Sequence, residues 1–424
     1  MEFAYSNGER KELKGASMTK LFSIPSILLT LLIPPTVWSA NLLDHVFTPG
    51  IAHAIHVQGN YAYIASANNS PDLSSEYDEL QIVDISDPNH LNLVSRTEFR
   101  TRGIAIHGIY VKGVYAYLAT GAEGLYVVDI SDPYRPELIQ NYSLGRTSGV
   151  FAVGEYIYVT GTRGGLKIIT GNPRDMYEIG ASQIPSNYPG YVGAKDIVVK
   201  ENYAYVAYGD AGLQIFNISD PRNPFWVGEY VYPHCFSNAI SINEEYAYVG
   251  CTGYEWGLQV INISNPRQPV LARYYETLDG IEDIFIKGPM VYIAYISGVE
   301  ILDVEDPYNP VQCDSYDTPV QAYGISAKGE FVYIADGWEG GMLAISSPCG
   351  RESPADELPQ FKTDICIPSG FSWSNNCPKK IDKKYEIKIN KCMLPISIFF
   401  KDCSKEKKKK YLKLRYPKII KNSL

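Results

Sequence analysis

The chain has 424 residues, of which 45% are hydrophobic and 20% are charged, and its formal net charge is −9. This composition is that of a globular protein and excludes a wholly disordered or fibrous one. The excess of acidic residues also argues against nucleic-acid binding, because Lys and Arg contacts to phosphates supply most non-specific affinity.

The first feature along the chain is an apolar segment near the N-terminus. Lys20 precedes the apolar run 21–33, and the small residues Ser39 and Ala40 follow it. A basic start, a short apolar core and small residues after it are typical of a secretory signal peptide, and the run is short for a membrane span. We therefore predict a signal peptide over residues 1–40, cleaved after Ser39 or Ala40.

Cleavage there would leave no transmembrane span in the mature chain and would place the protein outside the cytoplasm, secreted or at the cell surface. The alternative is an uncleaved membrane anchor. Met18 has the features of a natural start, and residues 1–17 are then an extension that does not belong to the native protein.

One phrase then returns along the chain: an apolar run that ends in a Ser-Asp-Pro-type turn. Five clear copies span residues 80–88, 125–133, 213–221, 258–266 and 299–307, and weaker copies end at Pro173 and Pro348. The seven prolines recur at intervals of 40 to 48 residues. Repeats of this length are typical of solenoids and propellers.

Each copy of the phrase belongs to a unit of four strand-like runs. In the first unit, runs at 54–57 and 61–65 precede the phrase, and both are rich in β-branched and aromatic residues. A more polar run that begins with Pro follows, such as 136–142, and Pro favours an edge strand. Seven such units predict an all-β fold, a seven-bladed β-propeller of four-stranded antiparallel blades over residues 41–349.

The seventh unit stops at Pro348 without a clear fourth run. A strand-like run at 42–47 precedes the first unit and has no blade of its own. We expect this N-terminal run to be the outer strand of blade seven and to close the ring, which would remove two free sheet edges.

The phrases Leu80–Asp84 and Leu125–Asp129, with their copies, resemble the LVIVD-repeat family of surface β-propellers from bacteria and archaea. The resemblance covers roughly residues 42–348, and the third and seventh copies of the phrase are shortened. It implies an extracytoplasmic location and a binding or adhesive role, and it implies no known reaction.

An Asp or Asn recurs in the phrase, at Asp84, Asp129, Asn217, Asn262 and Asp303. Such side chains accept hydrogen bonds from nearby backbone N–H groups and stabilise turns. Because the residue recurs in most units, we predict a structural role for it.

Another position varies between the units. It lies two residues before the apolar residue of the first strand on which the units can be aligned. It is polar in every unit: His53, His107, Ser148, Lys195, Asn238, Glu282 and Tyr323. The next position is small except at Asp196 and Asp283. The innermost strands of a propeller line its central channel, so these residues are expected to form a ring at one mouth, where ligands could bind.

His53, His107 and Glu282 are weak candidates for a metal site or for acid–base chemistry, since two imidazoles and a carboxylate suit both. A hydrated channel mouth without a ligand is the alternative. No catalytic motif and no cofactor motif occurs, so we assign no catalytic residue, no cofactor and no firm metal ligand.

Four cysteines lie in the propeller region. Cys235 and Cys251 come at the ends of two neighbouring runs and are candidates for a disulfide, with two separate buried thiols as the alternative. Cys313 and Cys349 have no evident partner.

The C-terminal segment 350–424 differs from the rest, with 18 basic and 8 acidic residues. The alternatives are a solvated basic tail, a small module held by disulfides or a metal, and a translated extension that is not native. Its bias towards Lys, Ile and Asn favours disorder or a non-native extension.

The sequence thus favours a non-catalytic binding scaffold, expected to be a monomer, that contacts a protein or a glycan at the cell surface. Tyr254, Glu255, Trp256 and Trp338 are candidate contact residues in exposed loops. The alternative is an extracellular hydrolase or lyase that uses the channel mouth.

Overall fold

The computed structural model describes residues 40–48, 50–68, 77–100, 106–161, 165–185, 193–337, 341–347 and 349, and two short strands nearer the C-terminus. The chain divides into two units, Met1–Asp356 and Glu357–Leu424. The second contains β29 (Ser397–Ile398) and β30 (Leu414–Arg415), which pair antiparallel. The predicted signal peptide before Ala40, most of the predicted tail, and Trp338 lie outside the described residues.

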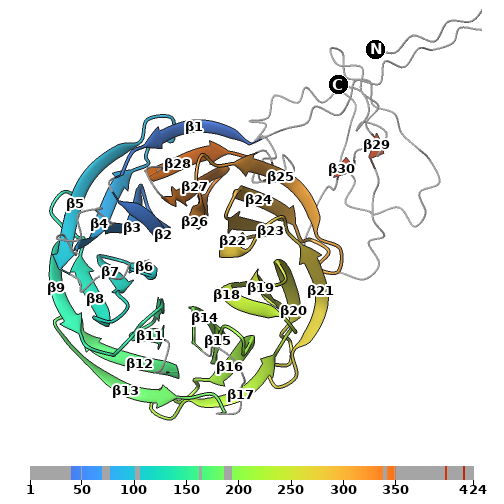
Figure 1. The fold of residues 1–424 in the computed structure, drawn as a ribbon, viewed down its shortest axis with the longest axis horizontal. Coiled ribbons are helices and arrows are strands. Elements are labelled where there is room, and N and C mark those ends of the chain that lie inside the picture. The colour runs from blue at the N-terminus through green and yellow to red at the C-terminus, as the bar shows by residue number, and fades with distance from the viewer. Residues whose placement is uncertain are drawn as a thin grey trace, which may run out of the picture. The chain divides into compact units, whose positions relative to one another are not determined.

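The first unit is a ring of seven four-stranded antiparallel sheets (Figure 1). The predicted seven-bladed β-propeller is therefore confirmed. In blades one to six the strands follow chain order from the channel outwards, and in blade seven β26, β27 and β28 do so.

The strands of the first four blades have the following bounds. Blade one contains β2 (Ile51–Gln58), β3 (Tyr61–Asn68), β4 (Tyr77–Asp84) and β5 (Asn92–Arg100). Blade two contains β6 (Gly108–Lys112), β7 (Tyr115–Ala119), β8 (Leu125–Asp129) and β9 (Glu137–Tyr142). Blade three contains β10 (Gly149–Val153), β11 (Tyr156–Gly161), β12 (Gly165–Asn172) and β13 (Asp175–Ser182). Blade four contains β14 (Asp196–Lys200), β15 (Tyr203–Ala207), β16 (Leu213–Asn217) and β17 (Phe225–Tyr230).

The remaining strands complete the ring. Blade five contains β18 (Cys235–Ile242), β19 (Tyr246–Gly253), β20 (Gly257–Asn262) and β21 (Val270–Glu276). Blade six contains β22 (Ile281–Lys287), β23 (Met290–Tyr295), β24 (Gly298–Asp303) and β25 (Val311–Asp317). Blade seven contains β26 (Ala322–Lys328), β27 (Phe331–Asp336), β28 (Gly341–Ser346) and β1 (Asn41–Val46).

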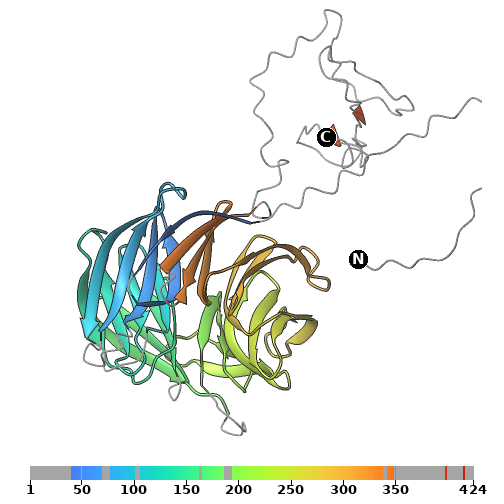
Figure 2. The same cartoon turned by 45° about the horizontal axis from the view of Figure 1, so that its top comes forward.

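The outer position of blade seven is occupied by the N-terminal strand. β1 pairs antiparallel with β28, in a register that sets Asn41 opposite Ser346 and Val46 opposite Met342. Figure 2 shows this dark-blue strand beside the orange strands of the last blade. Blade seven therefore combines strands from opposite ends of the propeller sequence.

The hydrophobic core lies between neighbouring blades, where the second and third strands of each blade bury both faces. In β16, for example, Leu213, Ile215 and Phe216 are fully buried. The outer strands alternate between exposed and half-buried residues. Adjacent blades also approach closely at the rim, because a Cβ atom at Gly228 in β17 would overlap the carbonyl oxygen of Pro266.

The repeated Asp or Asn holds the turn after the third strand, as predicted. Its Oδ1 accepts the backbone N–H two residues later in all five clear copies, at 2.8 to 3.1 Å. In the second copy, for example, Asp129 accepts the N–H of Ser131 at 2.9 Å. The recurrence of this residue is thus explained by turn geometry.

Two disulfides are present. Cys235 and Cys251, with Cα atoms 5.1 Å apart, join β18 to β19 in blade five. Cys313 and Cys349, 6.1 Å apart, join β25 of blade six to the segment after β28. Cys313 and Cys349 have no evident partner in the sequence, because their proximity arises from the packing of blade six against blade seven, which no local pattern encodes.

Among the residues that the structure describes, no helix is long and apolar enough to cross a membrane.

Candidate ligand site at the channel mouth

The variable polar residues lie where each blade enters its innermost strand. Four of them sit at β-bulges, the register shifts that surround His53, Asn238, Glu282 and Tyr323. A bulge leaves one residue without a partner on the neighbouring strand and redirects its side chain. The bulge therefore explains how these four positions can carry different polar side chains while the strands beyond them stay regular.

In blades two, three and four the corresponding residue directly precedes the innermost strand. The backbone N–H groups of His107, Ser148 and Lys195 each donate to a carbonyl at the end of the second strand, at 2.8 to 2.9 Å. These contacts fix the backbone at the start of β6, β10 and β14. All seven residues line one cavity.

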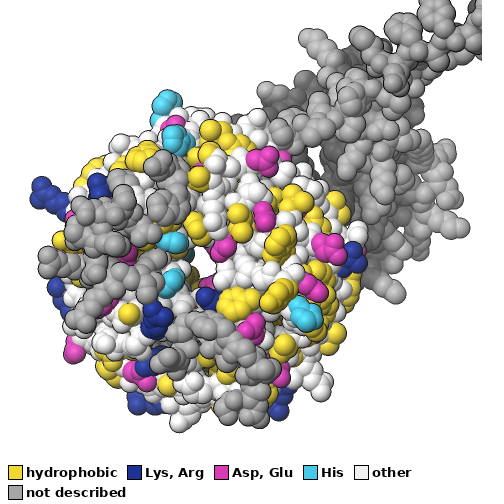
Figure 3. All heavy atoms as spheres, viewed as in Figure 1, with side chains coloured by type: hydrophobic (Ala, Val, Ile, Leu, Met, Phe, Trp, Pro, Cys, Tyr) yellow, Lys and Arg dark blue, Asp and Glu magenta, His cyan; other side chains and the backbone are white. Residues whose placement is uncertain are grey.

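The cavity has a volume of about 610 Å³ and extends along the channel. It corresponds to the central hollow in Figure 3, where His side chains lie on one side. A volume of this size falls in the range of small-ligand sites.

One half of the mouth is formed by imidazoles and cations. The ring of His53 contacts that of Tyr323, with centroids 4.9 Å apart. Burial lowers the pKa of His53, and burial together with His53, Lys195 and Arg146 lowers the pKa of His107 to about 4. Both imidazoles are therefore neutral near pH 7, and the potential at His107 is positive.

Lys195 connects this half to the other. Its ammonium lies 5.2 Å from the centroid of the Phe236 ring, within the range of a cation–π contact. Burial lowers the pKa of Lys195, and the charge of Glu282 opposes that shift.

The other half of the mouth centres on Glu282. Its carboxylate accepts from Nδ2 of Asn238 at 3.2 Å and from Nε2 of Gln321 at 3.3 Å. Burial raises the pKa of Glu282, and these two hydrogen bonds oppose the shift. The carboxylate that sequence analysis offered as a metal ligand is thus held by two amide donors.

Asp196 and Asp283 each connect two blades. Asp196 accepts the N–H of Ile197 at 2.7 Å and that of Ile240 in the next blade at 2.9 Å. Asp283 likewise accepts from Ile284 and from Ile325 in blade seven, both at 2.8 Å. These contacts explain why a carboxylate interrupts a row of small residues at these two positions.

Burial raises the pKa of Asp196 to about 6. It raises the pKa of Asp283 to about 7, with a further contribution from the negative charge of Asp196. The backbone hydrogen bonds act in the opposite direction at both residues.

Several lining residues were not found from the sequence. Arg146, in the loop before β10, lines the cavity, and no other unit has a basic residue at the same position, four residues before the aligned apolar one. Deeper in the channel His56, Tyr110 and Phe151 form a row, with successive ring centroids 4.8 and 4.5 Å apart. Each of these three residues directly follows the apolar residue on which the units are aligned. The alignment of the units could therefore have revealed the row.

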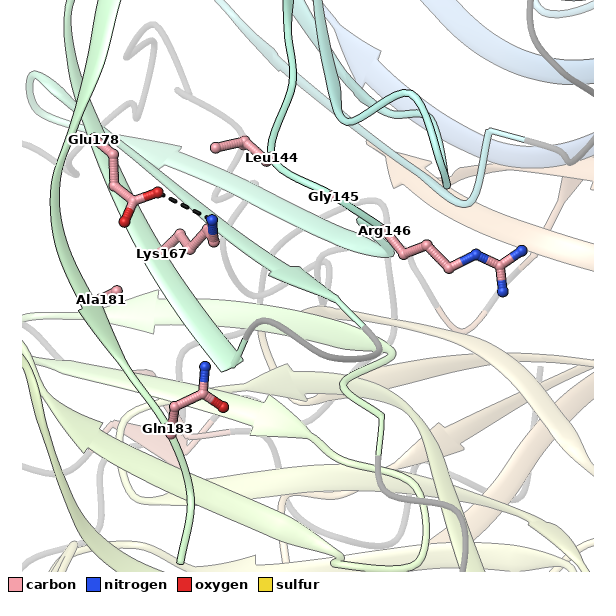
Figure 4. A pocket seen from close by; sticks show the side chains of 7 residues that line it. All are labelled: Leu144, Gly145, Arg146, Lys167, Glu178, Ala181 and Gln183. Carbon is pink, nitrogen blue, oxygen red and sulfur yellow. Dashed lines mark hydrogen bonds and ion pairs between the residues drawn. The ribbon is translucent and has the colours of Figure 1, made fainter. Parts of the chain in front are cut away.

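A second hollow of about 400 Å³ lies over blade three (Figure 4). The ammonium of Lys167 and the carboxylate of Glu178 form an ion pair across it at 3.1 Å. The Arg146 side chain extends away from this pair, as Figure 4 shows, and reaches the channel cavity. The two hollows thus share the loop that precedes β10.

The described residues contain no group of three or more His, Cys, Asp or Glu side chains placed to hold a metal ion. His53, His107 and Glu282 therefore do not form such a group with one another.

Exposed apolar side chains occur in the loops of blades five and six. Tyr254 and Trp256, in the turn between β19 and β20, are 94% and 46% exposed, and Leu278, before β22, is 78% exposed. Antiparallel strands alternate direction, so these loops and the start of each innermost strand share one face of the propeller. The apolar residues therefore lie on the same face as the mouth.

The comparison with protein families gives one match. The LVIVD-repeat model matches residues 49–98, 104–143, 192–231, 237–277, 281–318 and 321–345. The six matches cover every blade except blade three, whose turn phrase is one of the two shortened copies. A search of curated proteins finds no match.

Solved structures share the fold at very low sequence identity. The yeast protein Sqt1, from Saccharomyces cerevisiae, is similar with a TM-score of 0.52 and 7% identity, over 73% of this chain and 99% of that one. The computationally designed protein Ika8 is similar with a TM-score of 0.50 and 8% identity, over 72% and 98% of the two chains. Identities this low support the propeller fold alone, whereas the family matches extend over more than half of the chain: it belongs to the LVIVD-repeat family.

Proposed function

We propose that this protein is an exported, non-catalytic binding module that holds an anionic group of a protein or glycan at the channel mouth. The observation that supports this proposal is a difference between the hydrogen-bond acceptors and the hydrogen-bond donors of the cavity. Asp196, Glu282 and Asp283 each accept two hydrogen bonds from protein donors. These three carboxylates are therefore already engaged with protein donors.

The donor side chains on the opposite side of the mouth differ from these carboxylates in their hydrogen bonding. Within the described part of the chain, no hydrogen bond or ion pair joins the side chains of Arg146, His53 or His107 to another residue. Arg146 also contributes to the positive potential that lowers the pKa of His107. A guanidinium with neutral imidazoles beside it suits a carboxylate, which accepts charge-assisted hydrogen bonds.

The surroundings favour a macromolecular partner over a free ion. Exposed Tyr254, Trp256 and Leu278 lie on the same face, and aromatic side chains are enriched at contact surfaces. A partner that inserts an acidic group into the mouth would extend over these residues.

Binding of the full chain to paired immobilised probes tests this proposal. One pair is an oligosaccharide ending in glucuronate and the same oligosaccharide ending in glucose. The other is a peptide with a free C-terminal carboxylate and its amidated form. We expect the carboxylate form of at least one pair to bind better, and Arg146→Met to weaken that binding by about tenfold or more.

Two further variants sharpen the test. Glu282→Gln removes one negative charge of the cavity and should tighten binding of the carboxylate probe. Arg267→Met, in an exposed turn on the opposite face, is the matched control and should leave binding unchanged. Equal binding of charged and neutral probes would overturn the anionic ligand, and turnover of any probe would replace the binding module with the hydrolase or lyase alternative.

A further inference from the structure

The first described residue, Ala40, is anchored in the fold before the first strand begins. Its side chain is 7% exposed and packs in a core cluster with Leu343 and Ile345 of β28. Its backbone N–H donates to Oδ1 of Asp314 at 2.8 Å, across 274 residues of sequence. Ala40 is therefore a fixed point of the structure.

Asp314 is a buried carboxylate in the outer strand of blade six, and it is 6% exposed. Oδ1 also accepts from the N–H of Ser315 at 2.9 Å, and Oδ2 accepts from Oγ of Ser347 at 2.9 Å. In the described part of the chain, no Lys or Arg side chain forms an ion pair with it. A buried carboxylate without a cation is costly even when it is hydrogen-bonded.

We infer that Asp314 is the receptor for the mature N-terminus, formed when signal peptidase cleaves between Ser39 and Ala40. This inference rests on the proposed export of the chain and is independent of what the mouth binds. Water hydrolyses the amide between Ser39 and Ala40, leaving a carboxylate on Ser39 and, after proton uptake, an ammonium on Ala40. That ammonium would supply Asp314 with the missing positive charge at the position of the present N–H donor.

The local sequence favours this bond over the next one. Cleavage after Ser39 has Ser at the last position and Val37 two residues before it, which matches the small-residue pattern of signal peptidase sites. Cleavage after Ala40 would put the bulky Trp38 two residues before the last residue of the signal peptide. It would also remove the residue that contacts Asp314.

N-terminal sequencing of the exported protein is the first test. A mature chain that begins at Ala40 supports the inference. A chain that is cleaved at any other bond overturns it while leaving export intact, and recovery of the protein only uncleaved and inside the cell overturns export as well. Because binding at the mouth is measured separately, failure of this inference can be distinguished from failure of the binding proposal.

The second test is thermal unfolding of the mature chain against the same chain with Ser39 retained. The pKa of a free α-amino group is about 8 and rises beside a carboxylate, so its stabilising contribution is complete below about pH 8 and is lost as the pH rises through the folded value. We therefore expect the Tm of the Ala40 chain to fall by about 2 °C or more between pH 7.5 and 10, relative to the Ser39 chain. An identical pH profile would contradict the ion pair.

Asp314→Asn is the matched variant, because it keeps the shape and removes the charge. It should abolish the difference between the two pH profiles. Tyr292 and Tyr316 are the titratable side chains of the same cluster, and burial raises the pKa of both. They are present in both chains and cancel in the comparison.

Discussion

The two faces of this propeller are built from the same strands, yet they differ in what their sequences preserve. On the turn face, the phrase after each third strand repeats an Asp or Asn that caps the turn in the same way in five blades. On the mouth face, the position where each blade enters its innermost strand holds six different residue types in seven blades. The comparison shows that the residues of the turn face are determined by local backbone geometry, whereas the residues of the mouth face can vary and so can form a binding site.

The apolar part of the repeated phrase should have the largest effect on stability. Ile215 in β16 is fully buried, and Ile215→Ala should lower the free energy of unfolding by about 2–4 kcal/mol through lost burial and a residual cavity. Chemical denaturation measures this change. Val270→Ala, at a side chain that is 61% exposed, is the control and should change the free energy by less than about 0.5 kcal/mol.

The turn itself should contribute less. Asn217→Ala removes the acceptor of the Ser219 N–H, at 3.1 Å, and should cost about 1 kcal/mol without any effect on binding at the mouth. Denaturation and the probe-binding assay measure the two consequences. A loss of probe binding with unchanged stability would contradict the division between the faces.

Asp283 in the channel should give an effect of a different kind, a dependence of stability on pH. Folding raises the pKa of Asp283 from 3.8 to about 7, so the folded chain binds this proton more tightly than the unfolded chain. The stability that this group contributes is therefore present at low pH and is lost as the pH rises from about 4 to about 7. The groups that oppose its ionisation are Asp196 and Glu282.

Thermal unfolding at pH 4, 5.5 and 7.5 checks this dependence. Relative to the wild-type chain, Asp283→Asn should show a smaller loss of Tm over this range. Asp175→Asn, at an exposed position of β13, should keep the wild-type profile. A steeper loss in Asp283→Asn would show that the backbone hydrogen bonds from Ile284 and Ile325 outweigh burial.

Sequence reasoning recovered the repeated features because each was observed several times. The seven blades and the turn role of Asp129 and its counterparts follow from a local pattern that recurs. The alignment also brought His53, Glu282 and Tyr323 to one register, which the structure places around one cavity. A repeat thus supplies its own comparison within one chain.

Features that occur once were beyond this reasoning. Arg146 enters the cavity from a loop, and the Cys313–Cys349 bond depends on how blade six meets blade seven. The two hydrogen bonds that hold Glu282 come from Asn238 and Gln321 in the blades on either side. Contacts between blades depend on curvature and packing, which the period of a repeat does not determine.

The pairing of β1 with β28 has a consequence for how the chain reaches its native state. Contacts between residues far apart in sequence slow folding, because the intervening loop must close before they form. β1 leaves the ribosome first, but its partner is among the last strands of the propeller to be made. Blades one to six each consist of consecutive strands and can form in the order of synthesis. β1 has no partner strand until blade seven has been made. The pairing of β1 with β28 can therefore form only after blade seven has been made, and a chain truncated before β28 would leave β1 without its partner strand.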